Sequence, residues 1–197
     1  LLKPFKIIKL IINNKNLGVA QSRNLAIKYC KGHYIAFIDS DDLWKKNKLS
    51  DQYNFMKNKP SLFSFTSYDI IDENGRIIKK RKVYLDAEYN RLSKSNSIGL
   101  STVMIDKKLF PKIIFPHLKT HEDFGLWLKL IRLDIKLNHF DKTLSFWRKT
   151  NNSLSSNILY KLRDAFKLFY IYENKNLINS IFSVLILSYN KIVKELR

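Results

Sequence analysis

Three carboxylates, those of Asp39, Asp41 and Asp42, fall within four positions directly after the apolar run HYIAFI. The run predicts a buried strand over residues 33–39, which places the acids at its carboxyl end, where open α/β sheets bind ligands. Asp39 and Asp41 are two positions apart, so they point the same way in an extended chain. Two such oxygen ligands suit Mg²⁺ or Mn²⁺, which also bind substrate phosphates. The alternative is that Asp41 or Asp42 N-caps the next helix.

Hydrophobic periodicity predicts the elements that must position these acids. The first strand, helix, strand, helix order predicts right-handed crossovers and a parallel core, with Gly32 as a helix C-cap. The ENG tripeptide at 73–75 predicts a hairpin turn. The expected strands cover 5–12, 33–39, 62–72, 76–85, 99–106 and 142–148, and the expected helices cover 19–32, 43–58 and 121–133, followed by two amphipathic stretches after residue 157.

The composition is that of a basic globular domain. Lys and Arg number 36 against 17 Asp and Glu, a formal net charge of +19, which favours an anionic partner. No nucleic-acid-binding motif accompanies the charge, so we expect no nucleic-acid partner. The single cysteine, Cys30, forms no internal disulfide and indicates a reducing, cytoplasmic setting. No uninterrupted apolar stretch of about 18 residues is present, so we expect no transmembrane helix.

The string NKNLGVAQSRNLAIKYCKGHYIAFIDSDDLWKKNKL resembles the sugar-nucleotide-binding half of glycosyltransferase family 2. Later segments, SYDIIDENG, GLSTVMIDKKLF, HEDFGLWLKL and SFWRKTNNSLS, resemble later family elements, the last through Arg148 and Ser153. The resemblance covers roughly residues 5–157. The matching positions in the first string are Asn16, Gly18, Arg23, Asn24, Gly32, Tyr34, Ile35, Phe37, Asp39, Asp41 and Asp42.

The resemblance implies an α/β fold of GT-A (Rossmann-like) type, with a mostly parallel sheet flanked by helices. It also implies a metal-dependent, inverting glycosyltransferase that moves a sugar from a nucleotide diphosphate to a glycan or lipid-linked acceptor in cell-surface polysaccharide or lipopolysaccharide assembly. Asp123 would be the catalytic base, and Asp39 and Asp41 would hold Mn²⁺ or Mg²⁺. The donor-binding residues would be Asn16, Arg23, Asn24, Asp39 and Arg148.

Local sequence offers a second interpretation of Asp123. Thr120 and Asp123 are spaced as in a capping box, and acids in a first helical turn suit the helix dipole. Asp123 would then stabilise the helix without taking part in chemistry.

The start of the chain departs from the family pattern. The family's first strand with its P-x-Y-N loop, and the second strand with its acidic loop, are not seen, so we expect an N-terminally truncated domain that begins near the third strand. Two alternatives follow: a catalytically inactive remnant of such an enzyme, or a basic module that binds membrane or nucleic acid.

The expected organisation is a family-like domain over 1–157 and a helical tail over 158–197. Within the domain, residues 1–58 form the nucleotide-sugar half and 59–157 the acceptor half. Both tail stretches are apolar on one face and carry basic residues. They predict either peripheral contact with the inner face of the membrane or packing, including a homodimer contact.

Overall fold

The computed structural model describes residues 8–81, 83, 88–150 and 157–196. Its centre is a six-stranded sheet in the order β1-β5-β3-β6-β2, with β4 paired to the free part of β3. In chain order the elements are α1 (Gly18–Tyr29), β1 (Tyr34–Ala36), β2 (Leu43–Trp44), α2 (Lys48–Asn58), β3 (Phe63–Ile71), β4 (Ile77–Arg81), α3 (Tyr89–Leu92), η1 (Leu100–Thr102), β5 (Met104–Asp106), η2 (Lys107–Leu109), α4 (Glu122–Arg132), β6 (Asn138–Arg148), α5 (Ile158–Lys167), η4 (Leu168–Tyr172) and α6 (Leu177–Leu196).

The sheet is mixed, which corrects the expectation of a mostly parallel one. Only β3 and β6 pair in parallel among the described strands, whereas β1–β5, β3–β5, β3–β4 and β2–β6 are antiparallel. The reason is the insertion of β5 between β1 and β3. Because β5 is antiparallel to both, β1 and β3 still run in the same direction, as the predicted crossover requires, but they do not pair.

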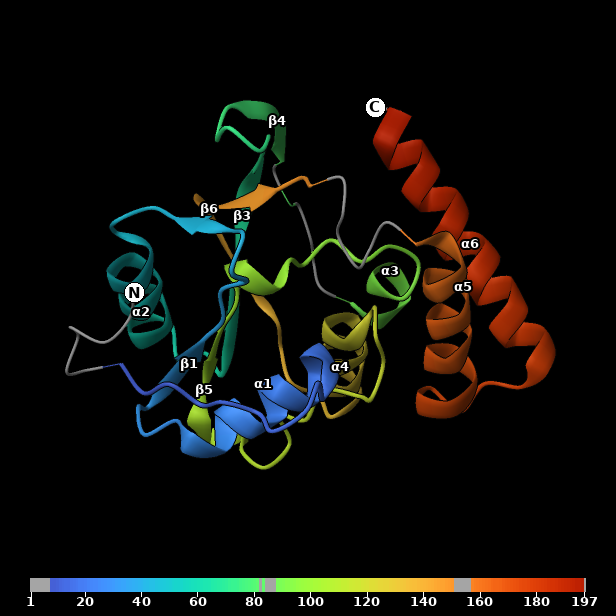
Figure 1. Cartoon of the computed structure of the whole chain (residues 1–197), viewed down its shortest axis with the longest axis horizontal. Coiled ribbons are helices and arrows are strands. Elements are labelled where there is room, and N and C mark those ends of the chain that lie inside the picture. The colour runs from blue at the N-terminus through green and yellow to red at the C-terminus, as the bar shows by residue number, and fades with distance from the viewer. Residues whose placement is uncertain (1–7, 82, 84–87, 151–156, 197) are drawn as a thin grey trace.

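Helices cover both faces of the sheet, which explains why every residue of β3 is buried. On one face the amide of Gln52 in α2 donates to the Ser64 hydroxyl of β3 over 2.9 Å. On the other face Phe63 of β3 meets the Trp127 ring of α4 edge-on, with ring centroids 5.0 Å apart. Figure 1 shows α2 and α4 on opposite sides of the strands. The apolar face predicted for 121–133 is therefore the face that α4 packs on the sheet.

Several helix ends differ from the prediction. Cys30, and not Gly32, is the C-cap of α1, and it adopts extended backbone angles there. The predicted helix over 43–58 begins only at Lys48, because Leu43 and Trp44 pair with β6 as a short strand.

Several predicted strands differ in length from the structure: β1 is shorter than the predicted 33–39, and β6 begins four residues before the predicted 142–148. Residues 1–7 lie outside the described residues, and 8–12 form no strand although Leu10 and Ile12 are apolar. Residues 100–102 form the 3₁₀ helix η1, so only 104–106 of the predicted strand 99–106 is extended. The hairpin is confirmed: Gly75 takes a φ of 85° at the turn between β3 and β4.

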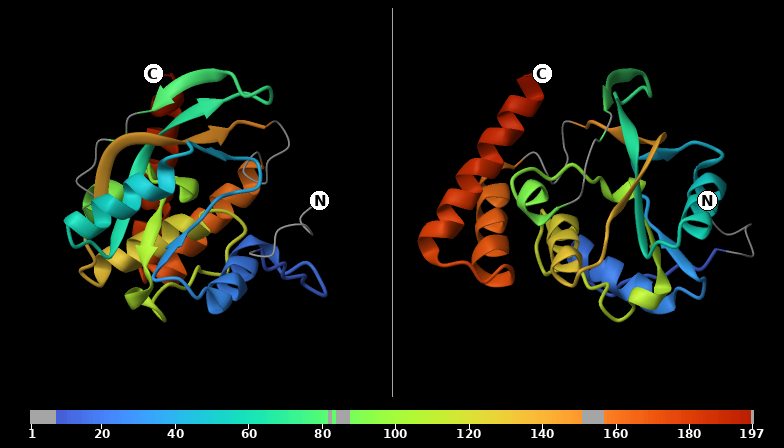
Figure 2. Two further views of the ribbon diagram at one scale, coloured as in Figure 1. Left: turned by 90° about the vertical axis from the view of Figure 1, so that its left-hand side faces the viewer. Right: turned by 180° about the vertical axis from the view of Figure 1, so that it is seen from behind.

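The tail joins the core through one buried carboxylate. Asp164 of α5 accepts the backbone N–H groups of Lys119 and Thr120, over 2.8 and 2.9 Å, just before α4 begins. Leu168 and Phe169 are fully buried in the same core as α4. Figure 2 shows α5 and α6 side by side, with α4 between them and the sheet.

Much of α6 is exposed, and this helix bears on the expectation about membrane spans. By length and composition alone, its residues 177–194 are long and apolar enough to cross a membrane. The stretch is not uninterruptedly apolar, since it contains the polar or charged residues Asn179, Ser180, Ser183, Ser188, Asn190, Lys191 and Lys194.

We expect Gly125→Ala to destabilise the fold. Gly125 lies in α4 where an added Cβ would meet Pro116 Cγ at 2.6 Å and Leu168 Cδ1 at 3.0 Å. Such overpacking costs about 1–3 kcal/mol. The measurement is the urea midpoint, with Gly99→Ala as control because its Cβ would make only ordinary contacts at 3.8 Å. Equal urea midpoints for the two variants would show that Pro116 and Leu168 do not pack closely enough against Gly125 to exclude a methyl group.

Candidate functional site

A cavity of 490 Å³ lies where the loop after β1, the start of α4 and the end of β6 meet. The acids predicted from the strand end and the acid predicted at the start of α4 both line it. Its lining residues with polar or charged side chains include Arg23, Asp39, Asp41, Asp42, Tyr68, Arg81, Ser101, Lys119, His121, Glu122, Asp123, Arg148 and Lys161.

The loop after β1 is fixed by Asp42, which the structure buries. The Asp42 carboxylate accepts the Ser101 hydroxyl over 2.6 Å and the Arg148 backbone N–H over 2.9 Å. Burial raises the pKa of the Asp42 carboxyl to about 6. The alternative that Asp41 or Asp42 caps the following helix is wrong, since Asn47 precedes α2 as its N-cap. Asp42 instead ties the acidic loop to η1 and β6.

Asp41, in contrast to the buried Asp42, lies in an exposed environment. Its side chain is exposed and makes no hydrogen bond or ion pair with the residues that the structure describes, while it lines the cavity. Its backbone carbonyl accepts Arg148 Nε over 2.8 Å. The loop is therefore held by its backbone and by Asp42, which leaves the Asp41 carboxylate available to a ligand.

Arg23 connects the two acidic groups of the cavity. One guanidinium nitrogen donates to Asp39 Oδ1 and another donates to Glu122 Oε1. The three side chains come from α1, the loop after β1 and α4, and the guanidinium also lies over the Phe115 ring at 5.6 Å. Burial lowers the pKa of Arg23, but the charges of Asp39 and Glu122 outweigh it and the net shift is upward. We call these three residues the Arg23 bridge.

Asp123 follows Glu122 and is half-buried at the cavity wall. Burial and, to a smaller extent, the negative charge of Glu122 raise the pKa of its carboxyl to about 7. One oxygen accepts the Phe124 backbone N–H over 2.6 Å. A carboxyl whose pKa lies near neutrality is well matched to accept a proton at neutral pH.

The capping-box interpretation of Asp123 is wrong. The N-cap of α4 is His121, which has a φ of 64° and makes no side-chain cap hydrogen bond. The Thr120 backbone N–H, which a capping box would direct to Asp123, donates to Asp164 instead. Burial also lowers the pKa of His121 to about 4, so its ring is neutral beside Asp123 at pH 7.

The other predicted donor residues fall in two groups. Arg148 lines the cavity, and its Nη1 donates to the backbone carbonyls of Asp72 and Glu73 over 2.9 Å each. Asn16 and Asn24 do not line it. Asn16 accepts the Gly18 N–H at the start of α1, and Asn24 exchanges two hydrogen bonds with the Phe115 backbone. Their donor-binding role stays a prediction, and Ser153 lies outside the described residues.

The carboxylates that line the cavity decide whether it could hold the expected Mg²⁺ or Mn²⁺. No group of three or more His, Cys, Asp and Glu side chains that could hold a metal ion occurs in the part of the chain that the structure describes. Two carboxylates, those of Asp39 and Asp41, do face the cavity, although Arg23 takes one oxygen of Asp39. This set fits Mg²⁺ or Mn²⁺ of the kind that takes one or two carboxylates and completes its shell with substrate phosphates and water.

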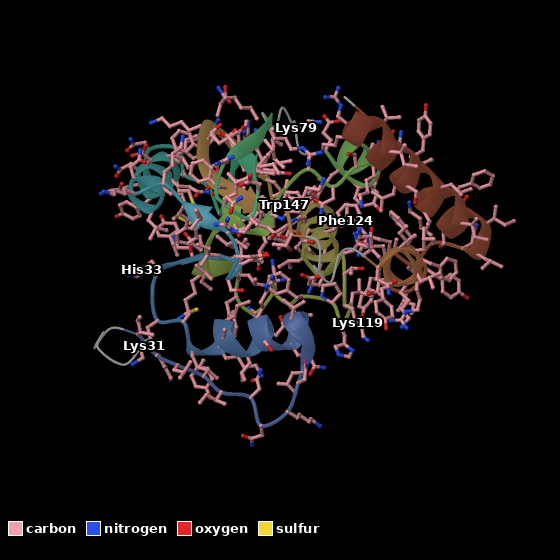
Figure 3. The ribbon with its side chains drawn as sticks, turned by 45° about the horizontal axis from the view of Figure 1, so that its top comes forward. Lys31, His33, Lys79, Lys119, Phe124 and Trp147 are labelled. Carbon is pink, nitrogen blue, oxygen red and sulfur yellow. The ribbon has the colours of Figure 1, made fainter. Side chains whose placement is uncertain are left out.

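Sequence reasoning missed several side chains of the cavity. Ser101 donates to Asp42 and accepts the Asp39 backbone N–H over 3.0 Å, yet it lies about 60 positions away. Tyr68 and Arg81 meet in the cavity from the β3–β4 hairpin, where Arg81 donates to the Tyr68 hydroxyl over 3.1 Å. Pairing of distant strands brings these residues together, so no local pattern identifies them. In Figure 3, Trp147 of β6, which lines the cavity, and Phe124 of α4, which is buried in the core, lie near the middle of the view.

Comparison with known proteins identifies similar chains. The sequence profile of the family described as Glycosyl transferase family 2 matches residues 1–115. The putative teichuronic acid biosynthesis glycosyltransferase TuaG of Bacillus subtilis is 35% identical over 170 residues, 84% of this chain and 65% of TuaG. The UDP-Glc:alpha-D-GlcNAc-diphosphoundecaprenol beta-1,3-glucosyltransferase WfgD of Escherichia coli is 36% identical over 160 residues, 79% of this chain and 61% of WfgD.

Solved structures confirm the fold. The crystal structure of S. aureus TarS 1-349 in complex with UDP-GlcNAc superposes with a TM-score of 0.60 at 23% identity, over 79% of this chain and 46% of that one. The chain spans roughly three fifths of the length of the curated relatives named above.

We expect Arg23→Gln to destabilise the protein more at pH 8 than at pH 5. Breaking a fully buried ion pair costs about 3–5 kcal/mol; because Asp39 is 38% exposed, we expect about 2 kcal/mol. Burial raises the pKa of Glu122 and the charge of Arg23 opposes that rise, so without Arg23 the folded-state pKa of Glu122 is higher and the variant regains stability as pH falls. The measurement is urea unfolding at both pH values, with the exposed Lys28→Gln on α1 as control. A deficit independent of pH would assign Arg23 a packing role on Phe115 instead.

Proposed function

This chain belongs to glycosyltransferase family 2, and on that premise we propose that it transfers a sugar from a nucleotide diphosphate donor to a hydroxyl group of a glycan or lipid-linked acceptor. The observation that carries the proposal is the single cavity that holds the strand-end acids Asp39 and Asp41 together with Asp123 of α4. Such a transfer needs two kinds of carboxylate. One kind holds the charged end of the donor through a cation, and the other receives a proton from the acceptor.

The donor side of the cavity is the acidic loop. Asp41 and the second oxygen of Asp39 would hold Mn²⁺ or Mg²⁺, which supplies positive charge to the leaving diphosphate when bound. Arg148 is fixed beside this loop by its bonds to the carbonyls of Asp41, Asp72 and Glu73, so its charge is held without rotamer freedom. Asp42 keeps its structural role, because both of its carboxylate oxygens accept hydrogen bonds from the protein.

Asp123 is the base of the proposal. An acceptor hydroxyl attacks the anomeric carbon and must lose its proton to a carboxylate within hydrogen-bond reach. Glu122 is less suited to accept this proton, because Arg23 holds its carboxylate in an ion pair. The raised pKa of Asp123 lets it accept a proton near pH 7 while it remains ionised above that pH.

The relatives support the chemical class. WfgD is named for transfer of glucose from UDP-glucose to a diphosphoundecaprenol-linked GlcNAc, TuaG is named for teichuronic acid biosynthesis, and TarS was solved with UDP-GlcNAc. We propose a UDP-sugar as donor and a lipid-diphosphate-linked sugar as acceptor, within the assembly of a cell-surface polysaccharide.

We expect Asp41→Asn to weaken Mn²⁺-dependent binding of UDP about tenfold or more while the fold is kept. Losing one anionic ligand weakens the cation site, whereas the exposed Asp41 side chain makes no bond that the fold needs. Calorimetry with and without Mn²⁺ measures this effect. Asp141→Asn, an exposed acid of β6 outside the cavity, is the matched control. Equal Mn²⁺-dependent affinity in both variants would refute the metal assignment, and no UDP binding by the parent chain would refute the donor.

We expect Asp123→Asn to lower turnover by about 10²- to 10⁴-fold with donor affinity little changed. Because the folded-state pKa of Asp123 is raised, its ionised form costs stability as pH rises toward 7, so the amide should not lower the melting temperature at pH 8. Parent turnover should rise with pH through about 7, since the base must lose its proton first. The assay is UDP release from UDP-glucose with a lipid-diphosphate-linked GlcNAc acceptor. A variant that melts early and keeps its turnover would show a structural role.

A further inference from the structure

One face of α6 carries a row of exposed apolar side chains. Six of them recur at helical spacing and are 46–66% exposed: Ile178, Ile181, Phe182, Leu185, Tyr189 and Ile192. We call this row the α6 stripe, and at 1.5 Å per residue it is about 20 Å long. Helical spacing places Lys191 and Lys194 on other sides of the helix, so neither charge interrupts the stripe. In Figure 1, α6 lies at the outer edge of the molecule, away from the sheet.

The other side of α6 is fixed to the rest of the molecule. Ser180 is fully buried there. The side-chain amide of Asn190 donates to the backbone carbonyl of Lys94 over 3.0 Å, and Lys79 Nζ donates to the backbone carbonyl of Lys194 over 3.3 Å. Because α6 is held along its length by these contacts, a surface that approaches the molecule from outside would meet the helix side-on, through the stripe.

We propose that the α6 stripe lies in the interface of an anionic lipid bilayer, with the axis of α6 parallel to the membrane plane. Amphipathic helices of this kind bury their apolar face at the boundary between headgroups and acyl chains. The inference goes beyond the proposed function and does not rest on it, because binding of a lipid surface by the tail needs neither a sugar donor nor an acceptor.

The charge of the tail identifies the partner as anionic. Residues 158–194 contain six cations: Lys161, Arg163, Lys167, Lys175, Lys191 and Lys194. The same range contains two acids, Asp164 and Glu173, and both are buried. Asp164 accepts the Lys119 backbone N–H, and Glu173 accepts the Tyr89 hydroxyl. The tail therefore exposes no carboxylate between residues 158 and 194, and its surface charge is positive. Cations near a negatively charged leaflet are attracted to it.

The neighbouring helix α5 combines a cation with apolar surface. Leu159 is 76% exposed and Leu162 is 42% exposed. Arg163 follows Leu159 by one helical turn, and its side chain is 50% exposed although it also meets Asp164 Oδ1 at 3.4 Å. The aliphatic part of such an arginine can lie along apolar surface while its guanidinium reaches a headgroup phosphate.

The same charge argues against a second copy of this chain as the occupant of the stripe. A two-fold contact places one surface against itself. The positively charged surface of one tail would then face that of the other, with no exposed carboxylate from residues 158–194 of either copy between them. Like charges that face each other across an interface are unfavourable. A bilayer that contains anionic lipid supplies the negative charge that a second tail lacks.

The test is flotation of the whole chain with vesicles made of equal parts phosphatidylcholine and phosphatidylglycerol. We expect the double variant Phe182→Ser, Leu185→Ser to bind about tenfold more weakly than the parent, or weaker still, because it removes apolar surface from the stripe. The control double variant Leu49→Ser, Ile114→Ser removes side chains that are 47% and 51% exposed outside the tail, and it should bind like the parent. Both variants keep the net charge, so a difference between them separates the stripe from the general attraction of a basic protein to anionic lipid.

Further results decide between the occupants. A second stripe variant, Tyr189→Ser with Ile192→Ser, should lose binding in the same way, and melting temperatures should stay near that of the parent because the replaced side chains are exposed. Equal binding by the stripe and control variants, or no binding by the parent, would overturn the proposal. Equal binding of the parent to pure phosphatidylcholine would overturn the anionic partner. Dimers in sedimentation that Phe182→Ser with Leu185→Ser dissociates, without vesicle binding, would assign the stripe to a second copy.

Discussion

The Arg23 bridge is the interaction on which the site depends. Arg23 joins Asp39 and Glu122, which lie 16 and 99 positions away, so one side chain of α1 fixes the distance between the strand-end loop and α4. Both anchored acids lie close in sequence to acids with a proposed function: Asp41 is two positions after Asp39, and Asp123 directly follows Glu122. The guanidinium charge compensates these two carboxylates, and it also opposes the rise in the pKa of Asp123 that burial and Glu122 cause.

A second fixed point lies at Asp42, which accepts hydrogen bonds from η1 and from the end of β6. Each anchor fixes one acid of the loop: Arg23 pairs with Asp39, and the donors from η1 and β6 hold Asp42. Asp39 and Asp42 have protein partners, whereas the carboxylate of Asp41 does not have one among the described residues. A stretch that looks uniform in sequence thus has two acids with structural roles, in ion pairing and in loop anchoring, and a third that we propose contacts a ligand.

The sequence predicted the parts of this structure that depend on local pattern. The apolar spacing of 124–131 predicts the buried face of α4, and the turn residues at 73–75 predict the hairpin. The strand-end acids and Asp123 do meet in one cavity. Sequence could not show that β5 would enter the sheet between β1 and β3, because a three-residue strand has no direction in its pattern. It also suggested a capping box at Thr120, and the structure replaces that box with Asp164 from 44 positions away. Tertiary packing decides whether a backbone N–H bonds to a nearby or to a distant acceptor. Residue spacing in the sequence carries no information about that packing.

The buried carboxylate of Asp164 bears on how far the helical tail is a separable module. Removing residues from 158 onward would leave the N–H groups of Lys119 and Thr120 without their acceptor, at about 1–3 kcal/mol for each donor that stays buried. It would also uncover Phe124 and Gly125 of α4, against which Phe169 and Leu168 now pack. The first tail helix is thus a structural support of the very turn that presents Asp123. A chimera that exchanges the helical tail for that of a relative would therefore have to keep Asp164, or replace the loop with Lys119 and Thr120 that Asp164 holds.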